Sequence, residues 1–140
     1  MAETTNKPAP DDAEPQGQII ACPKCAAAME QVTVGEVEID RCRGCGGLWL
    51  DAMEKERLLA SKESVDAADT GEQKVGKELD DQTNIHCPRD RSRMIHMVDL
   101  RQRHVGYESC QICGGVFLDA GELHDLANFT LLERIRAILG

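Results

Sequence analysis

The sequence predicts a small α+β protein made of two copies of one module, in which a β-hairpin joins two cysteine-containing knuckles and a short strand and a helix follow. Three observations predict this fold. Cysteines occur in closely spaced pairs, the pattern around them occurs twice, and only 30 of the 140 residues are Leu, Ile, Val or Phe. A module of about 40 residues is near the size at which an apolar core alone no longer stabilises a fold. The fold class is therefore a small metal-stabilised α+β protein.

Four cysteines of the first module have the spacing of a zinc site: Cys22, Cys25, Cys42 and Cys45. They form two Cys-x-x-Cys pairs separated by 16 residues, which is typical of zinc binding in an intracellular protein. Each pair places two sulfurs on one tight turn, and two facing turns complete a tetrahedral site with no open position. The alternatives are two disulfides or buried, unreactive thiols. The total of seven cysteines is odd and no secretory signal is visible, and both observations disfavour disulfides.

The same pattern returns later in the chain. Cys87-Pro-Arg-Asp90 repeats the first knuckle 65 positions on, and residues 110–120 repeat residues 42–52 at an offset of 68. Such an internal repeat indicates one structural unit made twice. Asp90 stands at the position of Cys25, and a carboxylate oxygen is an accepted zinc ligand, so Zn²⁺ is expected in both sites. The predicted ligands of the second site are Cys87, Asp90, Cys110 and Cys113.

The fourth ligand of the second site has alternatives. Either His86 or His96 replaces Asp90, or the site is incomplete. His86 is adjacent to Cys87, and adjacent residues seldom point at one metal ion, whereas His96 falls where a hairpin strand is expected. The other two histidines are expected to face solvent or to be satisfied locally. Iron is an alternative metal for the four-cysteine site, because such knuckles also accept iron.

The strands of the first module, residues 19–61, follow from alternation and turn residues. Apolar and polar residues alternate over 29–34 and 37–41, and Gly35-Glu36 separates the two runs, which predicts a β-hairpin. Residues 48–50 are predicted to form a third short strand.

A helix is predicted from Ala52 to about Ser61. Asp51 and Glu54 have the spacing of an N-terminal capping pair, with Asp51 as the cap. The helix is predicted to bury Met53, Leu58 and Leu59.

The second module, residues 86–128, has the same plan. Gly46 and Gly114 follow the second knuckle of their modules and are expected to take positive φ, which glycine adopts without steric cost. The second module is predicted to contain strands near 94–100, 105–109 and 116–118, followed by the capping pair Asp119 and Glu122.

Three segments lie outside the modules. Residues 1–18 contain acids and prolines without apolar periodicity and are predicted to be a disordered acidic tail. Residues 62–85 contain 3 basic and 7 acidic side chains and are predicted to be an exposed acidic linker, helical at its start. Residues 129–140 are predicted to extend the last helix as an amphipathic segment, because apolar residues from Leu123 to Leu139 recur at spacings of three and four.

This apolar stripe is longer than one small module covers. It is expected to mediate self-association or the docking of a partner. The alternative is a helix that packs only on its own module. The residues expected to make the contact are Phe129, Leu132, Ile135 and Leu139.

The run Cys42-Arg-Gly-Cys45-Gly-Gly-Leu-Trp-Leu-Asp51 and its second copy at 110–119 resemble the bacterial transcription-factor zinc-finger family. That family is named for its likeness to the zinc ribbon of transcription factor IIB, and both modules match it. The resemblance implies two tandem zinc ribbons whose zinc ligands include all seven cysteines. Asp90 is the departure from the family's pattern. The family name is an analogy of fold, and it implies a link to transcription without an activity.

Closed metal sites without a general base beside a nucleophile predict a non-enzymatic zinc-binding protein that acts as an interaction module, with no catalytic residue. A protein partner is expected. The net charge of −9 disfavours nucleic acid, although Arg89, Arg91 and Arg93 alternate on what is expected to be one strand face. No apolar run reaches 18 residues, so no membrane contact is expected, and the location is expected to be cytoplasmic.

The alternative function is thiol chemistry, as a zinc- and redox-responsive chaperone or a disulfide-exchange protein. Cys-x-x-Cys pairs serve both metal and redox roles. Hydrolase chemistry would need an open coordination position, which only the second site would supply if Asp90 did not bind.

Overall fold

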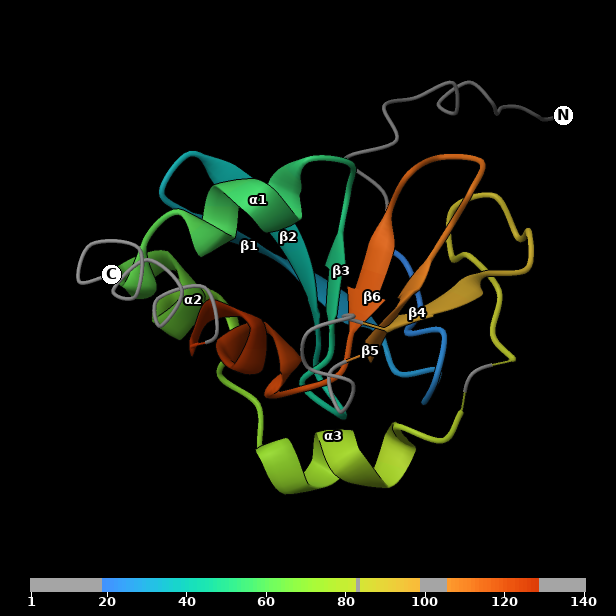
Figure 1. Cartoon of the computed structure of the whole chain (residues 1–140). Coiled ribbons are helices and arrows are strands. Elements are labelled where there is room, and N and C mark those ends of the chain that lie inside the picture. The colour runs from blue at the N-terminus through green and yellow to red at the C-terminus, as the bar shows by residue number, and fades with distance from the viewer. Residues whose placement is uncertain (1–18, 83, 99–105, 129–140) are drawn as a thin grey trace, which may run out of the picture.

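The computed structural model describes residues 19–82, 84–98 and 106–128, and there both modules share one antiparallel sheet (Figure 1). The strand order is β1-β2-β3-β6-β5-β4. Three neighbouring strands come from each module, so the modules meet inside the sheet. The strands are β1 (Met29–Val34), β2 (Val37–Cys42), β3 (Leu48–Leu50), β4 (Ile95–Val98), β5 (Gly106–Ser109) and β6 (Val116–Leu118).

The hairpins and the third strands lie where the sequence predicts them. β1 pairs with β2 along its whole length, and Gly35 turns between them with a φ of 63°. β4 pairs with β5 from Ile95 opposite Ser109 to Val98 opposite Gly106. The predicted loop end of this second hairpin lies outside the described residues.

The first helix, α1 (Glu54–Leu59), is shorter than predicted. The predicted start at Ala52 is wrong, because Met53 takes a left-handed conformation with a φ of 75° and the helix begins after it. The prediction that Met53 is buried is also wrong: it is 68% exposed, since it precedes the helix and does not lie on its packed face. Leu58 is fully buried as predicted, and Leu59 is partly buried against the same core.

One half of each predicted capping pair is present. The backbone N–H of Asp51 donates to Glu54 Oε1 at 2.8 Å, and the backbone N–H of Asp119 donates to Glu122 Oε1 at 3.0 Å. The other half is absent at α1, where no side chain caps the helix. The Asp51 carboxylate instead accepts from Trp49 Nε1 at 3.1 Å, so it is used inside the fold.

Residues 62–85 are not an exposed linker. They form α2 (Lys62–Ala68), which confirms the helical start, and α3 (Gln73–Leu79). Val65 and Ala68 are 1% and 0% exposed. The segment is predicted to be exposed because it has many charged residues, but it also has a small apolar face that packs on the core.

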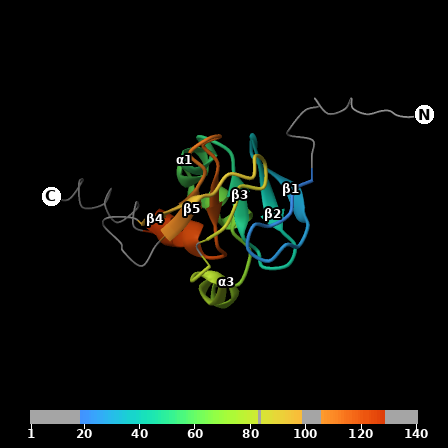
Figure 2. The same cartoon turned by 90° about the vertical axis from the view of Figure 1, so that its right-hand side faces the viewer.

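The segment is also tied to the second module by polar and close backbone contacts. Asp69 is buried and accepts the backbone N–H groups of Gly121 at 2.9 Å and His124 at 3.2 Å. A Cβ at Gly76 would overlap the backbone of Ala120, so only glycine allows α3 to pack this closely. α1 and α3 lie at opposite ends of the strands (Figure 2), and α2 lies beside the helical segment 122–128 (Figure 1).

A local two-fold relation joins the modules at β3 and β6. Trp49 lies opposite Phe117, and these two residues occupy the same position in the repeat. The flanking pairs, Leu48 with Leu118 and Leu50 with Val116, are also related by this symmetry, with one substitution of leucine by valine. The two modules therefore meet as the subunits of a symmetric dimer do, through one patch used twice.

Alternate side chains of β3 belong to two different apolar clusters, as the geometry of a strand requires. Leu48 and Leu50 pack with α1, α2 and the helical segment 122–128. Trp49 and Phe117 belong to the other cluster, which contains five of the seven cysteines. Most of the predicted metal ligands thus lie on the Trp49 side of the sheet.

The predicted acidic tail and the predicted docking residues Phe129, Leu132, Ile135 and Leu139 lie outside the described residues. Three earlier members of the apolar stripe are described: Leu123, Leu126 and Ala127 are 0%, 7% and 7% exposed and pack in the cluster of Leu58. Within the described ranges, no helix has the length and apolar character needed to cross a bilayer.

Candidate metal centres

Four tight turns carry the predicted ligands, and each contains one residue in a left-handed conformation. In the first turn of each module, Ala26 and Arg91 take φ values of 68° and 69°. In the second turn, Gly46 and Gly114 take 79° and 82°, which confirms the prediction for these glycines. This backbone shape points N–H groups at the cysteine sulfurs and fixes their orientation.

In the first module the four cysteine sulfurs converge within 4.8 Å of one another. The Sγ atoms of Cys22 and Cys45 are 3.7 Å apart, and those of Cys25 and Cys42 are 3.3 Å apart. Four sulfurs arranged tetrahedrally at 2.3 Å from a zinc ion lie about 3.8 Å from one another. The spacing therefore suits a Zn²⁺ ion.

Backbone N–H groups stabilise the thiolate form of these cysteines. Cys42 Sγ accepts from the N–H groups of Gly44 at 3.2 Å and Cys45 at 3.3 Å, and Cys22 Sγ accepts two from its own turn at 3.4 and 3.5 Å. The hydrogen bond from the Cys45 thiol, opposed by burial, lowers the pKa of Cys22 to about 5. Without a metal ion the negative charge is thus favoured at Cys22, whereas burial raises the pKa of Cys25, and the hydrogen bond to Cys22 together with burial raises that of Cys45.

The second module brings its four predicted residues together in the same way. One ligand atom each from Cys87, Asp90, Cys110 and Cys113 lies within 4.8 Å of the others. Cys87 Sγ is 3.8 Å from Cys113 Sγ, and Cys110 Sγ is 3.3 Å from Asp90 Oδ2. Three sulfurs and one carboxylate oxygen suit a second Zn²⁺ ion.

Asp90 is held ready for this position by Ser92. Asp90 Oδ1 accepts from the Ser92 hydroxyl at 2.6 Å and from the Ser92 backbone N–H at 2.9 Å. These bonds lower the pKa of Asp90 to about 2, so the carboxylate is ionised at neutral pH. The other oxygen remains directed at the sulfurs.

Neither alternative histidine joins the second group. His96 Nδ1 lies 2.7 Å from Glu108 Oε2, so the ring is engaged on the neighbouring strand. His86 is exposed and forms an isolated β-bridge. Of the two remaining histidines, His104 lies outside the described residues, and His124 is partly exposed and contacts α2, with Nε2 3.0 Å from Asp66 Oδ1. The structure therefore brings Asp90, and neither His86 nor His96, to the three sulfurs of the second module.

The family described as "Transcription factor zinc-finger", a zinc ribbon of the transcription factor IIB type, matches residues 21–61 and 86–128. These two ranges make up more than half of the chain. The chain belongs to this family. Its two modules are two tandem zinc ribbons, called the first and second ribbon from here on, and the two cysteine-rich groups suit two Zn²⁺ ions. No curated protein and no solved structure matches the chain.

The arginines of the second ribbon do not alternate on a strand face, which corrects that expectation. Arg89 lies in the knuckle turn, Arg91 has a positive φ, and β4 begins only at Ile95, because the knuckle occupies more of the chain than the alternation suggests. The Arg89 guanidinium reaches into the first ribbon, with Nε 3.1 Å from Asp51 Oδ1 and Nη2 3.1 Å from Asp40 Oδ2. Arg89 is thus engaged within the protein.

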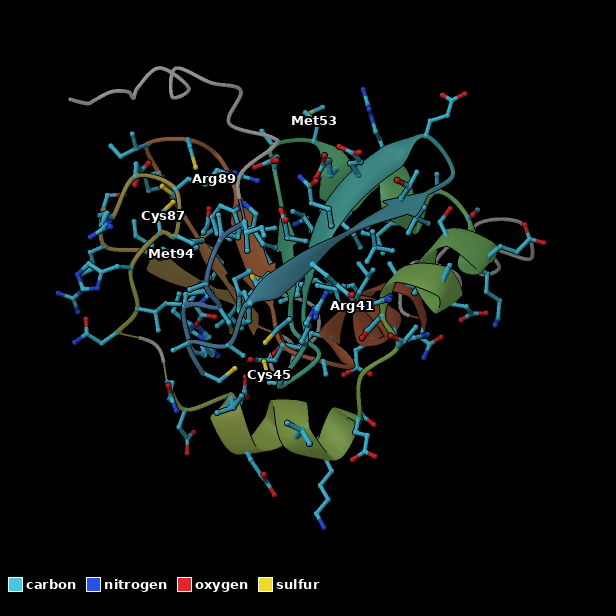
Figure 3. The ribbon with its side chains drawn as sticks, turned by 180° about the vertical axis from the view of Figure 1, so that it is seen from behind. Arg41, Cys45, Met53, Cys87, Arg89 and Met94 are labelled. Atoms are coloured by element: carbon cyan, nitrogen blue, oxygen red, sulfur yellow. The ribbon has the colours of Figure 1, made fainter. Side chains whose placement is uncertain are left out.

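Lys24 of the first ribbon makes the equivalent contacts in the opposite direction. Its Nζ is 2.6 Å from Asp119 Oδ2 and 3.5 Å from Glu108 Oε1, and its side chain is 0% exposed. Neither contact is predicted from the sequence: Lys24 is not among the predicted functional residues, and Arg89 is expected on a strand face. The signal that identifies both is the repeat, which places Lys24 and Arg89 at one position. The metal groups themselves are separate: Cys45 and Cys87 lie well apart, with Arg89 beside Cys87 (Figure 3).

A third group of potential ligands contains only carboxylates. Oxygens of Asp80, Asp119 and Glu122 lie within 4.8 Å of one another, and Lys24 already balances part of their charge. Burial, together with the charge of Asp119, raises the pKa of Glu122 to about 9. Glu122 therefore keeps its proton at neutral pH.

The raised pKa of Glu122 predicts a pH dependence of stability. In the unfolded chain this group titrates near 4.5, so between about pH 4.5 and 9 the folded state holds a proton that the unfolded state has lost. The free energy of unfolding should then fall as pH rises, by at most about 1.4 kcal/mol per pH unit. Glu122→Gln keeps the acceptor for the Asp119 N–H and should flatten this slope in urea unfolding of zinc-loaded protein at pH 6 and pH 8. Glu78→Gln, an exposed change on α3, should leave the slope as it is; equal slopes in both variants contradict the assignment.

Proposed function

We propose that this protein is a non-enzymatic module that holds two structural zinc ions and binds a protein partner. The observation that carries the proposal is that each metal group is closed, because four ligand atoms of the chain converge on one point and leave no position for a substrate. The seven free thiols support a reducing, cytoplasmic location. The proposed ligands are Cys22, Cys25, Cys42 and Cys45 in the first ribbon, and Cys87, Asp90, Cys110 and Cys113 in the second.

The mixed ligand set predicts that the second site is the weaker one. Oxygen suits zinc less well than thiolate beside three sulfurs. Asp90→Ala should weaken zinc binding at that site by roughly tenfold or more, since even residues that only support a ligand contribute 10–100-fold. Asp90→Cys should tighten it, and the unsubstituted second site should lose metal first to a chelator or at mildly acidic pH. These results are read as zinc content and chelator competition.

His96→Ala is the matched control for the rejected ligand. It should leave the affinity unchanged, because His96 lies against Glu108. If Asp90→Ala keeps full affinity and His96→Ala loses it, the ligand assignment is wrong.

Two features favour a protein partner over nucleic acid: the negative net charge of the chain and the exposed apolar residues of the edge strand β4. The net charge of −9 opposes phosphate binding, and Arg89 is already paired with carboxylates. β4 is the last strand of the sheet order, and all four of its residues are exposed, including Ile95 at 47% and Met97 at 39%. An apolar edge strand of this kind accepts an extended segment of a partner by β-strand addition.

Capture of partners by the zinc-loaded full chain tests this function. A specific protein should be retained after nuclease treatment and lost in Met97→Lys, because a lysine on an edge strand opposes strand addition. Thr33→Lys, on the opposite edge strand β1, is the matched control and should keep the partner. Retention that disappears with nuclease, or that ignores Met97→Lys, contradicts the proposed surface.

A redox role is a second candidate because Cys25 of the first site and Cys113 of the second site are both exposed and accessible to an oxidant. Thiolates that form a disulfide release their zinc. Because its oxygen ligand makes the second site the weaker one, mild peroxide should empty that site first and produce a matching gain in the holding of unfolded clients. Zinc release without that gain is oxidation damage and argues against the role.

A further inference from the structure

We infer that the two zinc sites are coupled across the ribbon interface, because each metal knuckle is held by carboxylates of the other ribbon through Lys24 and Arg89. Metal at one site therefore raises the affinity of the other. The inference rests on the proposed ligands and goes beyond them, since neither the family nor the fold class requires the two sites to communicate.

Each ribbon contributes one cation that contacts acids of the other ribbon, and this reciprocal contact is called the exchange of Lys24 and Arg89. Lys24 is its first half and lies between two proposed ligands, Cys22 and Cys25. Its ammonium group is buried and contacts Asp119 and Glu108 of the second ribbon at 2.6 and 3.5 Å. It also donates to the Leu79 carbonyl oxygen at 3.0 Å, which adds α3 to the contact. A shift of the first knuckle would therefore leave charged groups of the second ribbon unpaired.

The second half is Arg89, which lies between the proposed ligands Cys87 and Asp90. Its guanidinium contacts Asp51 and Asp40 of the first ribbon, each at 3.1 Å. In the repeat, these acids correspond to Asp119 and Glu108, the partners of Lys24. The same contact is thus made twice, once in each direction.

Both sets of acids are fixed in their own ribbon. A displacement of one knuckle is therefore passed on to the other ribbon through these contacts. Asp51 and Asp119 stand at the ends of β3 and β6, and their N–H groups are bound by Glu54 and Glu122. β3 and β6 are neighbours in the sheet. A knuckle that loses its metal consequently disturbs the strand ends on which the other ribbon depends.

Coupling between two binding sites is reciprocal, and its usual size is about 5–150-fold in affinity. The interface here combines a fully buried lysine with a two-pronged arginine contact. Disabling the second site should therefore weaken the first by roughly tenfold.

The experiment measures the Zn²⁺ affinity of the first site in the full chain with and without a functional second site. Cys110→Ser combined with Cys113→Ser disables the second site, and Co²⁺ spectra identify the four-sulfur site that remains. The ratio of the two affinities is the coupling. In an Arg89→Met background this ratio should fall to roughly threefold or less, because the exchange is broken on one side.

Arg43→Met is the matched control. Arg43 also lies between two proposed ligands, Cys42 and Cys45, but its side chain is 69% exposed and its ion pair, 3.7 Å to Glu30, stays within the first ribbon. It changes the charge beside the first site without touching the interface, so the tenfold ratio should persist. If Arg89→Met does not fold, Arg89→Lys keeps the charge without the fork that reaches both carboxylates, and it should give an intermediate ratio.

A ratio near one in the unsubstituted chain overturns the inference, as does a ratio that Arg89→Met or Arg89→Lys leaves unchanged. Failure of the proposed function is a different result. It would appear as fewer than two zinc ions bound per chain, whatever the ratio.

Discussion

Cys42→Ser should remove one zinc ion from each chain and unfold residues 22–60. Cys42 ends β2, is 4% exposed, and accepts two backbone N–H hydrogen bonds from its knuckle. The serine hydroxyl of the variant removes one metal ligand, and it is a poor match for the two N–H groups that point at the sulfur. Structural zinc contributes about 10–16 kcal/mol in small sites. That is comparable with the whole stability of most domains, about 5–15 kcal/mol. The first ribbon therefore has no stable form without its ion.

Metal analysis and the dispersion of backbone amide signals measure this result. Zinc content should fall by at least one ion, and the signals of the first ribbon should collapse to the random-coil region without recovering in excess zinc. The second ribbon shares the sheet, so it should be destabilised as well. Asp90→Cys, which adds a thiolate at the second site, controls for a general effect of altered thiol number and should keep both ribbons folded. Native dispersion of residues 22–60 in metal-free Cys42→Ser would show that the core alone suffices.

The metal groups and hairpins were predictable because they depend on residues close together in the chain. Gly35 separates two alternating runs, and that pattern alone specifies a hairpin. A Cys-x-x-Cys pair is one turn, so its two sulfurs are neighbours in any fold that contains it. Asp90 followed from the repeat, which placed it at the position of Cys25.

The helices between the ribbons were not predictable from charge. The acids of 62–85 outnumber its apolar residues, yet Val65, Ala68 and Gly76 lie on the packed side of α2 and α3. Alanine and glycine contribute little to the hydrophobicity of a segment, so composition does not identify a packed face that contains them. They matter here because they allow the backbone to approach its neighbours closely, as Gly76 does at Ala120.

The joint between the ribbons, which is the pairing of β3 with β6, was also not predictable from the sequence. β3 and β6 are three residues long, and no pattern in so short a strand says which other strand lies beside it. The repeat contained the missing information, because a unit made twice can pair with itself about a two-fold axis. Arg89 and Lys24 are understood only once that pairing is known, since their partners lie in the other ribbon.

Trp49→Ala should destabilise both ribbons together by about 3–5 kcal/mol, the usual cost of truncating a buried tryptophan. Trp49 is 0% exposed, lies opposite Phe117 at the joint, and donates to Asp51, the partner of Arg89. The packing is close on both sides: a Cβ on Gly115 would overlap the Trp49 ring, and one on Gly47 would overlap the Phe117 ring. The indole thus fills the interface and orients one of its ion pairs, and no neighbouring side chain can take its place.

Trp49 is shared by the two halves of the sheet. Its loss should therefore lower the urea midpoint of a single unfolding transition and should not divide that transition into two. Urea unfolding of zinc-loaded protein, followed by far-ultraviolet circular dichroism and by amide signals from each ribbon, should give one midpoint for both ribbons, shifted to lower urea. Met53→Ala, a change at a residue that is 68% exposed, should stay within about 0.5 kcal/mol of the unsubstituted protein. Two separate midpoints, with the second ribbon unaffected by Trp49→Ala, would mean that the ribbons fold independently, and the exchange of Lys24 and Arg89 would then have no route by which to couple the zinc sites.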